Sequence, residues 1–376
     1  MKKYFFIFGL LAIGGVGFWG WNKNQFLLNP LSGKKNLGQK TWLNSEKSKK
    51  IFGFLPTWMI GKTRLYSNEM SHLIFLGIEA DEKGNLIWDI QAKKINDEVY
   101  LNQKREIQKN GGKNILGIKL FDDEKLKKLL ENKEAVDNLI NQIKVVQQGF
   151  GVNGFDGVNL DFEYQNDPLA ILGNDFEMFL DEIKKADLGE ISVDVFANTV
   201  IKGDEQELKS LLEKIDNLVV MAYDFHRPGV DFAGPVAPIG SNVGKRNIRE
   251  VVEKIIAINL DKQKIIMAYP LYGYEWETYT KEFGSQIKRG WYQMASWRRV
   301  REIIETASAE ALEVKWDELS MSPWLVFEEK GKIHQIYFED EKSLKAKIDL
   351  VKQNQLAGWG FWALGYEGED TSIWGY

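Results

Sequence analysis

Short apolar runs alternate with segments of helical period from Ile51 onward, and this alternation constrains the fold more than any other feature of the chain. Amphipathic segments such as 122–151 and 247–258 separate several of the runs. Strands that alternate with helices form parallel sheets, and eight such strands close a barrel. Eight runs have the length and composition of strands: 51–57, 72–78, 114–120, 154–163, 191–197, 217–223, 264–270 and 357–364. The sequence therefore predicts an α/β fold, a (β/α)8 TIM barrel, over residues 49–376.

The stretch between the last two predicted strands, 271–356, is long enough to hold an insertion. Within it, residues 322–340 have the pattern of a β-hairpin that turns near 329–331 and is followed by a helix. We expect a small α+β insertion at about 275–345, which could form one wall of a cleft. An open doubly wound sheet is the alternative to the barrel, but no glycine-rich phosphate turn follows the first strand.

The N-terminus has the pattern of a membrane-directing segment. Lys2 and Lys3 precede an uncharged apolar run, Tyr4–Trp21, which approaches the length of a bilayer span. We expect residues 1–21 to form an uncleaved anchor, with a cleaved signal peptide as the alternative, and residues 22–48 to form a polar linker. The protein is then extracytoplasmic, held at the membrane or secreted if the segment is removed.

Composition excludes several classes of function. The net charge of -5 and the pI of about 5.6 argue against a nucleic-acid partner. The chain has no cysteine and three widely spaced histidines, so we expect neither a metal site nor another cofactor. The 13 Trp, 13 Tyr and 21 Phe residues suit flat ligands such as sugar rings, although a large core also uses them. We expect a monomer.

The stretch "FDGVNLDFEY" places Asn159, Asp161 and Glu163 at alternate positions, with apolar residues between them. Side chains on a strand alternate between faces, so the three polar groups share one face. In a barrel the apolar face meets the helices and the polar face points inside, with Glu163 nearest the catalytic end. Burying three polar groups is costly unless they are paired or used. The pattern favours catalysis over an exposed amphipathic strand or an inert hydrogen-bond network.

Residues 155–163, "FDGVNLDFE", resemble the signature of family 18 glycoside hydrolases, the chitinase-like enzymes, at all nine positions. Three further segments resemble that family in the same order along the chain. They are "MAYD" at 221–224, "YPLYGYEW" at 269–276 and "GWGFWALGYE" at 358–367. The resemblance covers about residues 50–376 and implies a glycosidase that acts on polysaccharides containing N-acetyl sugars.

The resemblance implies substrate-assisted hydrolysis, in which the substrate's own 2-acetamido oxygen is the nucleophile. Glu163 would be the general acid, with its pKa raised by burial and by the charge of Asp161. Asp161 would orient the acetamido group, and Tyr223 would hydrogen-bond its oxygen. Among residues that contact the substrate, the resemblance places Asp224, Trp362, Met221 and Tyr269. Trp58, at the end of the first predicted strand, is a further candidate, with rim packing as its alternative.

Several positions depart from the typical chitinase pattern. Asn159 stands where those enzymes have Asp, so it cannot share a proton with Asp161, although it could donate a hydrogen bond to it. We expect activity with an altered pH profile. The Ser-x-Gly-Gly motif is absent from 117–123, and Gln165 stands where Pro is common. Together with the segment 233–240, these features resemble those of bacterial spore-cortex and cell-wall hydrolases. They favour peptidoglycan-type bonds as the substrate without excluding chitin.

Two other functions compete with hydrolysis: a non-hydrolytic glycan-binding protein on the same barrel, and a cell-wall scaffold that displays the insertion. The presence of Glu163 argues against the first of these, and the absence of both binding and turnover would favour the second. Three residues are weaker candidates for a role in the site. His226 reads as a loop residue, Trp276 is either a subsite or rim packing, and Asp156 reads as a residue that stabilises the base of the barrel.

Overall fold

The structure is a computed structural model of the whole chain, and it describes residues 49–63, 68–149, 154–241, 246–306 and 312–368. Residues 48–376 form one compact unit. The predicted anchor and linker, residues 1–48, lie outside the described residues. Among the helices that the structure describes, none combines the length and apolar character needed to cross a membrane.

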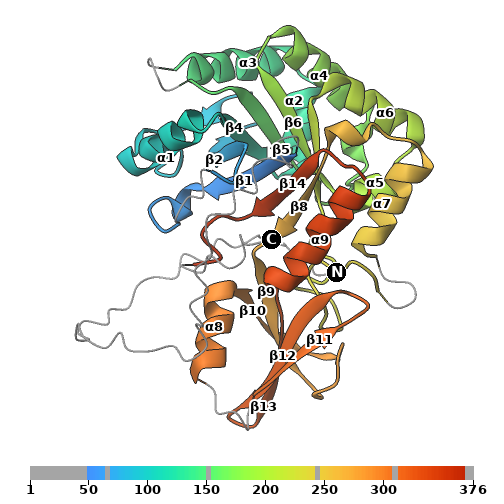
Figure 1. Cartoon of the computed structure of the whole chain (residues 1–376). Coiled ribbons are helices and arrows are strands. Elements are labelled where there is room, and N and C mark those ends of the chain that lie inside the picture. The colour runs from blue at the N-terminus through green and yellow to red at the C-terminus, as the bar shows by residue number, and fades with distance from the viewer. Residues whose placement is uncertain (1–48, 64–67, 150–153, 242–245, 307–311, 369–376) are drawn as a thin grey trace, which may run out of the picture. The chain divides into compact units, whose positions relative to one another are not determined.

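Eight parallel strands close into a barrel, in the spatial order β1-β14-β8-β7-β6-β5-β4-β2, with β1 pairing again to β2 (Figure 1). The strands are β1 (Lys50–Pro56), β2 (His72–Ala80), β4 (Lys113–Leu120), β5 (Gly157–Phe162), β6 (Glu190–Phe196), β7 (Asn217–Met221), β8 (Ile265–Pro270) and β14 (Gly358–Trp362). A short strand, β3 (Leu86–Ile87), pairs antiparallel with β2. Each of the eight predicted strands is present, so the predicted barrel is confirmed.

After β2, helices lie between successive barrel strands and cover the outside of the barrel, whereas a 3-10 turn (Thr57–Met59) follows β1 (Figure 1). They are α1 (Glu98–Lys109), α2 (Asp123–Leu130), α3 (Lys133–Gln148), α4 (Asn174–Lys185), α5 (Ala197–Lys202), α6 (Glu205–Lys214), α7 (Ile248–Ala257) and α9 (Glu341–Gln353). The amphipathic stretch 122–151 forms two helices because Asn132 caps the second one. Its side chain accepts hydrogen bonds from the backbone N–H groups of Glu134 and Ala135, as asparagine commonly does at a helix start.

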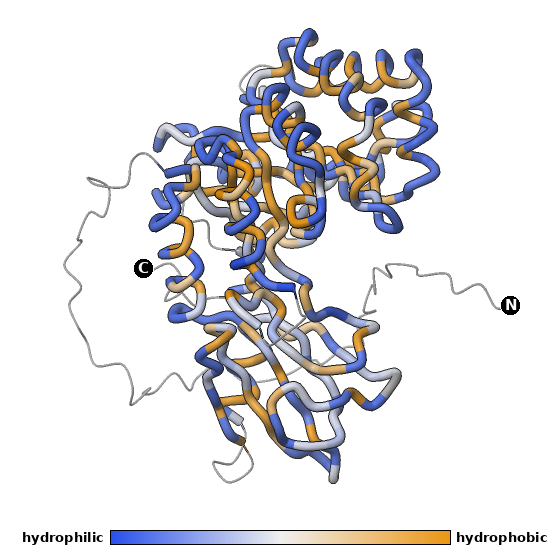
Figure 2. Tube along the Cα trace, turned by 90° about the vertical axis from the view of Figure 1, so that its right-hand side faces the viewer, coloured by the Kyte–Doolittle hydropathy of each residue, from blue (hydrophilic) through white to orange (hydrophobic). Residues whose placement is uncertain are grey.

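Two apolar layers hold the barrel together. The outer layer joins one face of each strand to the helices, and it includes Val158, Leu160 and Phe162 of β5. The inner layer fills the barrel itself with side chains such as Phe52 of β1 and Ile115 of β4, together with residues of β2, β7 and β8. Figure 2 shows hydrophobic residues concentrated along the strands and recurring along the helices between hydrophilic ones. The alternation of the strands therefore sets which residues face the barrel interior.

An ionic network fills the amino-terminal end of the barrel. Glu190 at the start of β6 accepts hydrogen bonds from Lys113 at the start of β4 and from Asn217 at the start of β7. Its carboxylate also lies 3.0 Å from Nε2 of His72, at the start of β2. Catalytic groups in such barrels lie at the opposite, carboxyl-terminal end of the strands, so we interpret this network as structural.

The insertion after β8 is a five-stranded antiparallel sheet in the order β10-β9-β13-β12-β11. Its elements are β9 (Tyr272–Thr278), β10 (Ile287–Ser296), α8 (Trp297–Thr306), β11 (Leu312–Asp317), β12 (Ser322–Glu329) and β13 (Lys332–Tyr337). The predicted hairpin is present, and its turn residues Lys330 and Gly331 both have positive φ. An aromatic cluster covers one face of the sheet, and Val300 and Ile303 of α8 pack on the other. The predicted α+β insertion is therefore confirmed.

Candidate active site

The polar face of β5 points into the barrel, as predicted. Its apolar residues lie in the outer layer, and Asn159 and Asp161 are 0% and 4% exposed. Glu163 follows the last residue of β5 and is half-buried at the mouth. The three groups therefore form a column that leads to the carboxyl-terminal end of the barrel.

Asp161 and Glu163 hydrogen-bond to each other through their side chains. Burial raises the pKa of Asp161 to about 7, against the opposing effect of the Lys119 charge. The pKa of Glu163 lies well above its usual value because of burial and the charges of Asp161 and Asp194. A carboxyl group that stays protonated near neutral pH can act as a proton donor. The raised pKa of Glu163 agrees with the direction predicted from the sequence.

Asn159 donates no hydrogen bond to Asp161, although the sequence allowed one. Its amide nitrogen donates to Oδ1 of Asp194 at 2.7 Å and to Oγ of Ser192 at 3.1 Å. The reason is the register between β5 and β6, which sets Asn159 directly opposite Ser192. The polar face of β6 therefore supplies the partners of Asn159.

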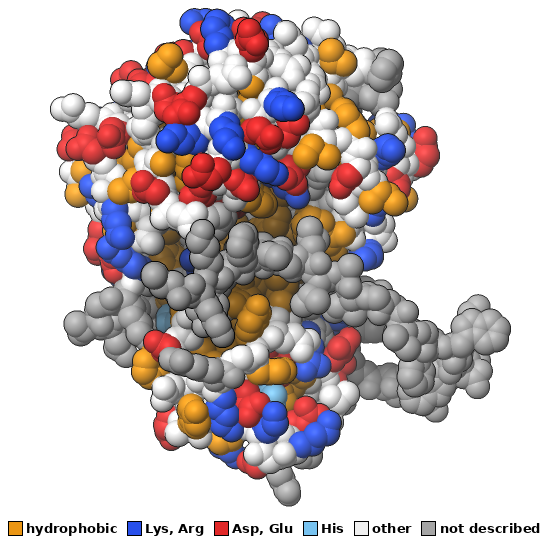
Figure 3. Space-filling view, turned by 180° about the vertical axis from the view of Figure 1, so that it is seen from behind, with side chains coloured by type: hydrophobic (Ala, Val, Ile, Leu, Met, Phe, Trp, Pro, Cys, Tyr) orange, Lys and Arg blue, Asp and Glu red, His pale blue; other side chains and the backbone are white. Residues whose placement is uncertain are grey.

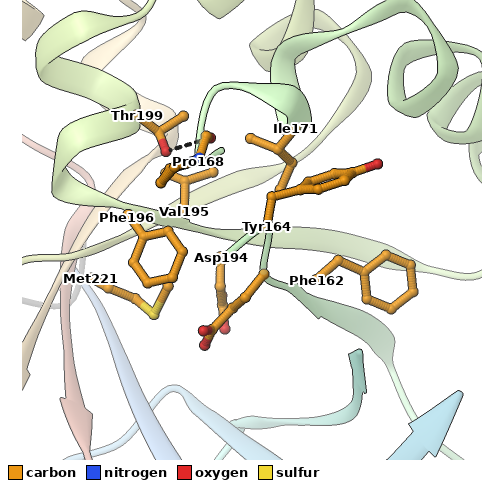
Figure 4. Close-up of a pocket in the computed structure, with 10 residues that line it drawn as sticks. Phe162, Tyr164, Pro168, Ile171, Asp194, Val195, Phe196, Thr199 and Met221 are labelled. Atoms are coloured by element: carbon orange, nitrogen blue, oxygen red, sulfur yellow. Dashed lines mark hydrogen bonds between the residues drawn. The ribbon is translucent and has the colours of Figure 1, made fainter. Parts of the chain in front are cut away.

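Sequence reasoning missed Asp194. The run "ISVDVFA" carries Ser192 and Asp194 at alternate positions among apolar residues, which is the same signal as in β5. Asp194 is 4% exposed and lines one pocket with Glu163 and the predicted substrate contact Met221. Figure 4 shows the side chains of Asp194 and Val195 leaving their strand on opposite sides. The cluster beside Glu163 thus has a third carboxyl group, in addition to those of Asp161 and Glu163.

Tyr223 and Asp224 follow β7, and the structure brings both to the same site. Burial and four surrounding carboxyl groups, Asp161 and Glu163 among them, raise the pKa of Tyr223 well above its usual value. Its hydroxyl therefore stays protonated and can donate a hydrogen bond. Asp224 has a φ of +58°, a left-handed conformation that Asp tolerates better than most residues.

Two tyrosines of the insertion hold Asp224, and sequence reasoning missed both. Its Oδ1 accepts hydrogen bonds from the hydroxyl groups of Tyr272 at 2.6 Å and Tyr274 at 3.2 Å. Burial raises the pKa of Asp224, although these two bonds oppose the rise. The insertion therefore contributes directly to the site.

Trp362 and Trp58 lie at the rim. Trp362 ends β14, is half-buried, and packs against the barrel interior and the aromatic cluster of the insertion. Trp58 hydrogen-bonds to Tyr366, whose ring centroid lies 6.0 Å from that of Tyr272. Figure 3 shows a recess between the barrel and the insertion in which hydrophobic side chains gather. Trp362 thus borders the space between the barrel and the insertion.

Tyr269 is a wrong prediction. It is 0% exposed, and its hydroxyl donates to the backbone oxygen of Lys347 in α9 at 3.2 Å. Ile266 and Ala268 belong to the inner layer, so Tyr269 points outward by alternation.

Trp276 and His226 are structural as well. Trp276 is buried in the aromatic cluster of the insertion. Nδ1 of His226 lies 2.9 Å from the backbone oxygen of Pro235, within its own loop. Asp156 accepts a hydrogen bond from the backbone N–H of Asn114 at 2.8 Å, which fits a role at the barrel base.

The sequence profile of the family described as "Glycosyl hydrolases family 18" matches residues 42–367. This chain belongs to that family. It is 28% identical to the putative sporulation-specific glycosylase YdhD and 25% identical to the cortical fragment-lytic enzyme, both of Bacillus subtilis. Each match covers 65% of this chain and 54% of the relative, so the chain spans about half the length of these relatives.

Solved structures agree with the fold. A family 18 chitinase from Cycas revoluta, in complex with (GlcNAc)3, superposes with a TM-score of 0.71 at 17% identity. The alignment covers 85% of this chain and 96% of the chitinase. At this identity, the likeness supports the barrel and not the substrate.

This family 18 chain carries two further residues at the site that sequence reasoning did not assign. Lys119 of β4 pairs in register with Asp161, and its Nζ lies 5.7 Å from the centre of the Phe121 ring. Gln165 donates a hydrogen bond from its side-chain amide to Oε2 of Glu163, and this bond opposes the rise in the pKa of Glu163. Among the residues that the structure describes, no group of three His, Cys, Asp or Glu side chains could hold a metal ion.

Proposed function

We propose that this chain is a retaining glycosidase that cleaves β-1,4 bonds of N-acetylglucosamine-containing polysaccharide with the substrate's acetamido group as nucleophile. The observation that carries the proposal is the hydrogen-bonded pair of Asp161 and Glu163 at the carboxyl-terminal end of β5. One of the two is poised to donate a proton, and the other carries or shares a negative charge beside it.

In the first step, Glu163 transfers its proton to the glycosidic oxygen while the acetamido oxygen attacks the anomeric carbon. The bond from that carbon to the leaving sugar breaks, and a cyclic oxazolinium ion forms on the retained sugar. Asp161 holds the acetamido N–H and offsets the positive charge. In the second step, the Glu163 carboxylate removes a proton from water, and the water oxygen attacks the anomeric carbon from the face that the leaving group occupied. The bond from that carbon to the acetamido oxygen breaks, which opens the oxazolinium ring. The configuration at the anomeric carbon is therefore retained.

The other site residues support this scheme by position. The neutral hydroxyl of Tyr223 can donate to the acetamido oxygen as charge develops on it. Asp224 is oriented by the hydroxyl groups of Tyr272 and Tyr274, which suits it to accept hydrogen bonds from sugar hydroxyls. The half-buried indole of Trp362 offers a flat apolar face to a sugar ring.

Peptidoglycan-type glycan is the substrate that we favour, with chitin as the second. The cortical fragment-lytic relative is named for the lysis of cortical fragments, and the Cycas revoluta neighbour is named as a chitinase in complex with (GlcNAc)3. Both polymers contain the N-acetylglucosamine unit that the scheme needs. A glucan without acetamido groups would supply no nucleophile and should resist the enzyme.

The test is mass spectrometry of the products that the full chain releases from purified peptidoglycan and from N-acetyl chito-oligosaccharides. Glu163→Gln is the inactive comparison, and Glu106→Gln on the exposed side of α1 is the matched control. We expect products with reducing N-acetylglucosamine ends from the parent and the control, and none from Glu163→Gln. Binding without release by the parent would support the glycan-binding alternative, and neither binding nor release would overturn both.

We further propose that the barrel acts outside the cytoplasm, because Lys2 and Lys3 precede the apolar run Tyr4–Trp21. Residues 1–48 fused to a reporter that is active only after export test this directly. An inactive reporter would refute the proposal, and the size of the fusion would show whether the segment is cleaved.

A further inference from the structure

Asp194 occupies a position in the site that the proposed mechanism does not use. It stands on β6, next to the catalytic strand, and its Oδ1 accepts the amide hydrogen of Asn159 at 2.7 Å. Two buried oxygens of the same cluster, Oδ1 of Asn159 and Oδ1 of Asp161, have no hydrogen-bond partner among the described residues. The cluster therefore contains two acceptors that need a donor.

A count of charges indicates which donor is available. Asp161, Glu163 and Asp194 are three carboxyl groups in one largely buried cluster, and Lys119 is the cation that acts on Asp161. Ionising all three would place three negative charges in a region with little water, which is strongly unfavourable. Burial and the charge of Asp161 raise the pKa of Asp194 well above its usual value. A protonated Asp194 has an O–H to donate, and the two unpartnered oxygens are acceptors.

We propose that Asp194 is the second acid of the site: the buried cluster of Asp161, Glu163 and Asp194 shares its protons across neighbouring strands, and Asp194 takes the part of the side chain at position 159. Its kinetic consequence rests on the proposed function. The sequence led us to expect that Asn159 would abolish proton sharing, whereas β6 returns a carboxyl group to the cluster. Asp194 acts through Asp161 and Glu163 and is thus a positioning residue.

The shared proton has a direct effect on the general acid. When the cluster loses a proton at rising pH, Asp194 can release it while Glu163 keeps its own. The negative charge that forms on Asp194 then raises the pKa of Glu163 further. Glu163 therefore stays protonated, and the enzyme stays active, to a higher pH than a site without Asp194 would allow.

The decisive variant is Asp194→Asn, because an asparagine oxygen can still accept the amide hydrogen of Asn159. Only the titratable group is removed. The alkaline limb of the pH profile of kcat/KM reports the acid of the free enzyme. We expect this limb to move to lower pH by about one unit, which lowers the rate above it about tenfold.

The exchange Asn159→Asp with Asp194→Asn returns one carboxyl group to the cluster and should return the limb toward its original position. Ser192→Ala is the matched control, because it removes the other acceptor of Asn159 without changing any charge, and its limb should stay in place. An unmoved limb in Asp194→Asn overturns the proposal. So does a double variant whose limb remains where that of the single variant lies.

A second measurement needs no substrate and decides the matter if Asp194→Asn fails to fold. The aspartate carboxyl carbons of the full chain are labelled with 13C and followed by NMR as pH is changed. The signals of Asp161 and Asp194 are assigned from Asp161→Asn and from the double variant. Two linked titrations support the shared proton, and two independent curves refute it. If the parent releases no product from any polymer, the proposed hydrolase fails while this measurement still decides the role of Asp194.

Discussion

Replacing Asp161 by asparagine should stabilise the protein while abolishing most of its activity. Asp161 is 4% exposed, and burial raises its pKa from 3.8 to about 7 despite the nearby Lys119 charge. Asparagine has nearly the same shape and no ionisable group. The variant therefore removes the cost of holding a charge in the barrel without opening a cavity.

The size of the effect follows from linkage between proton binding and folding. The folded state binds the Asp161 proton more tightly than the unfolded state does, so the parent loses stability as pH rises from about 4 to about 7. A shift of about three units, at 1.36 kcal/mol per unit, corresponds to about 4 kcal/mol above pH 7. Local relaxation and the exposed part of Lys119 reduce this figure, so we expect a gain in the free energy of unfolding of about 2 to 4 kcal/mol at pH 8. Near pH 4 the two proteins should be equally stable.

Urea unfolding of the full chain at pH 4.5, 6 and 8 measures this dependence. Asp187→Asn is the matched control, because Asp187 is exposed and its φ of +54° suits asparagine as well. The control should show no pH-dependent gain above pH 6. Equal stability of the Asp161→Asn variant and the parent at pH 8, or a gain of the same size at every pH, would refute the reasoning about burial.

Activity provides the second half of the prediction. Without the Asp161 carboxylate, the acetamido group loses its orienting partner and the charge that offsets the oxazolinium ion. We expect kcat to fall by about a hundredfold or more, at all pH values. A variant that is stabilised at pH 8 and fully active would show that Asp161 is buried for a structural reason and would remove it from the mechanism.

Three other changes test separate parts of the site and the barrel. Gln165→Ala removes a hydrogen bond that favours the ionised form of Glu163, so the alkaline limb of kcat/KM should move to higher pH by about half a unit. A limb that moves to lower pH would contradict the contact. Burial alone would raise the pKa of Glu190, but its basic partners outweigh burial and hold that pKa far below its usual value. Its contribution to stability is therefore present above about pH 4.5 and lost as pH falls, so Glu190→Gln should cost about 2 kcal/mol in urea unfolding at pH 7 and little at pH 3. Tyr272→Phe removes one of the two hydroxyl groups that hold Asp224, and kcat/KM should fall about fivefold with the melting temperature nearly unchanged; a loss of stability without a loss of rate would assign the bond to packing.

The eight strands and the polar face of β5 could be predicted because both depend on local periodicity. A strand repeats every two residues, so Asn159, Asp161 and Glu163 must share a face wherever the strand lies. The hairpin at 329–331 was equally local, since a turn and its flanking strands adjoin in the chain. The division of 122–151 into two helices was missed, although the cap at Asn132 is itself a local signal.

Tyr269 shows where periodicity carries no information. The run "IIMAYP" of β8 is apolar at almost every position, because both faces of a barrel strand are covered. Nothing in such a run states which side faces the interior. Pairing with β7 and β14 sets that side, and it directs Tyr269 outward to α9.

Contacts between strands distant in the chain were decided by the tertiary structure alone. The bond from Asn159 to Asp194 spans 35 positions, and the bond from Tyr274 to Asp224 spans 50. The first bond depends on the register between neighbouring strands, and the second depends on how the insertion folds back over the barrel. Both are set by the packing of the whole domain. The chain's own pattern thus determines which chemical groups reach the mouth of the barrel, and the pairing of strands determines which of them lie together.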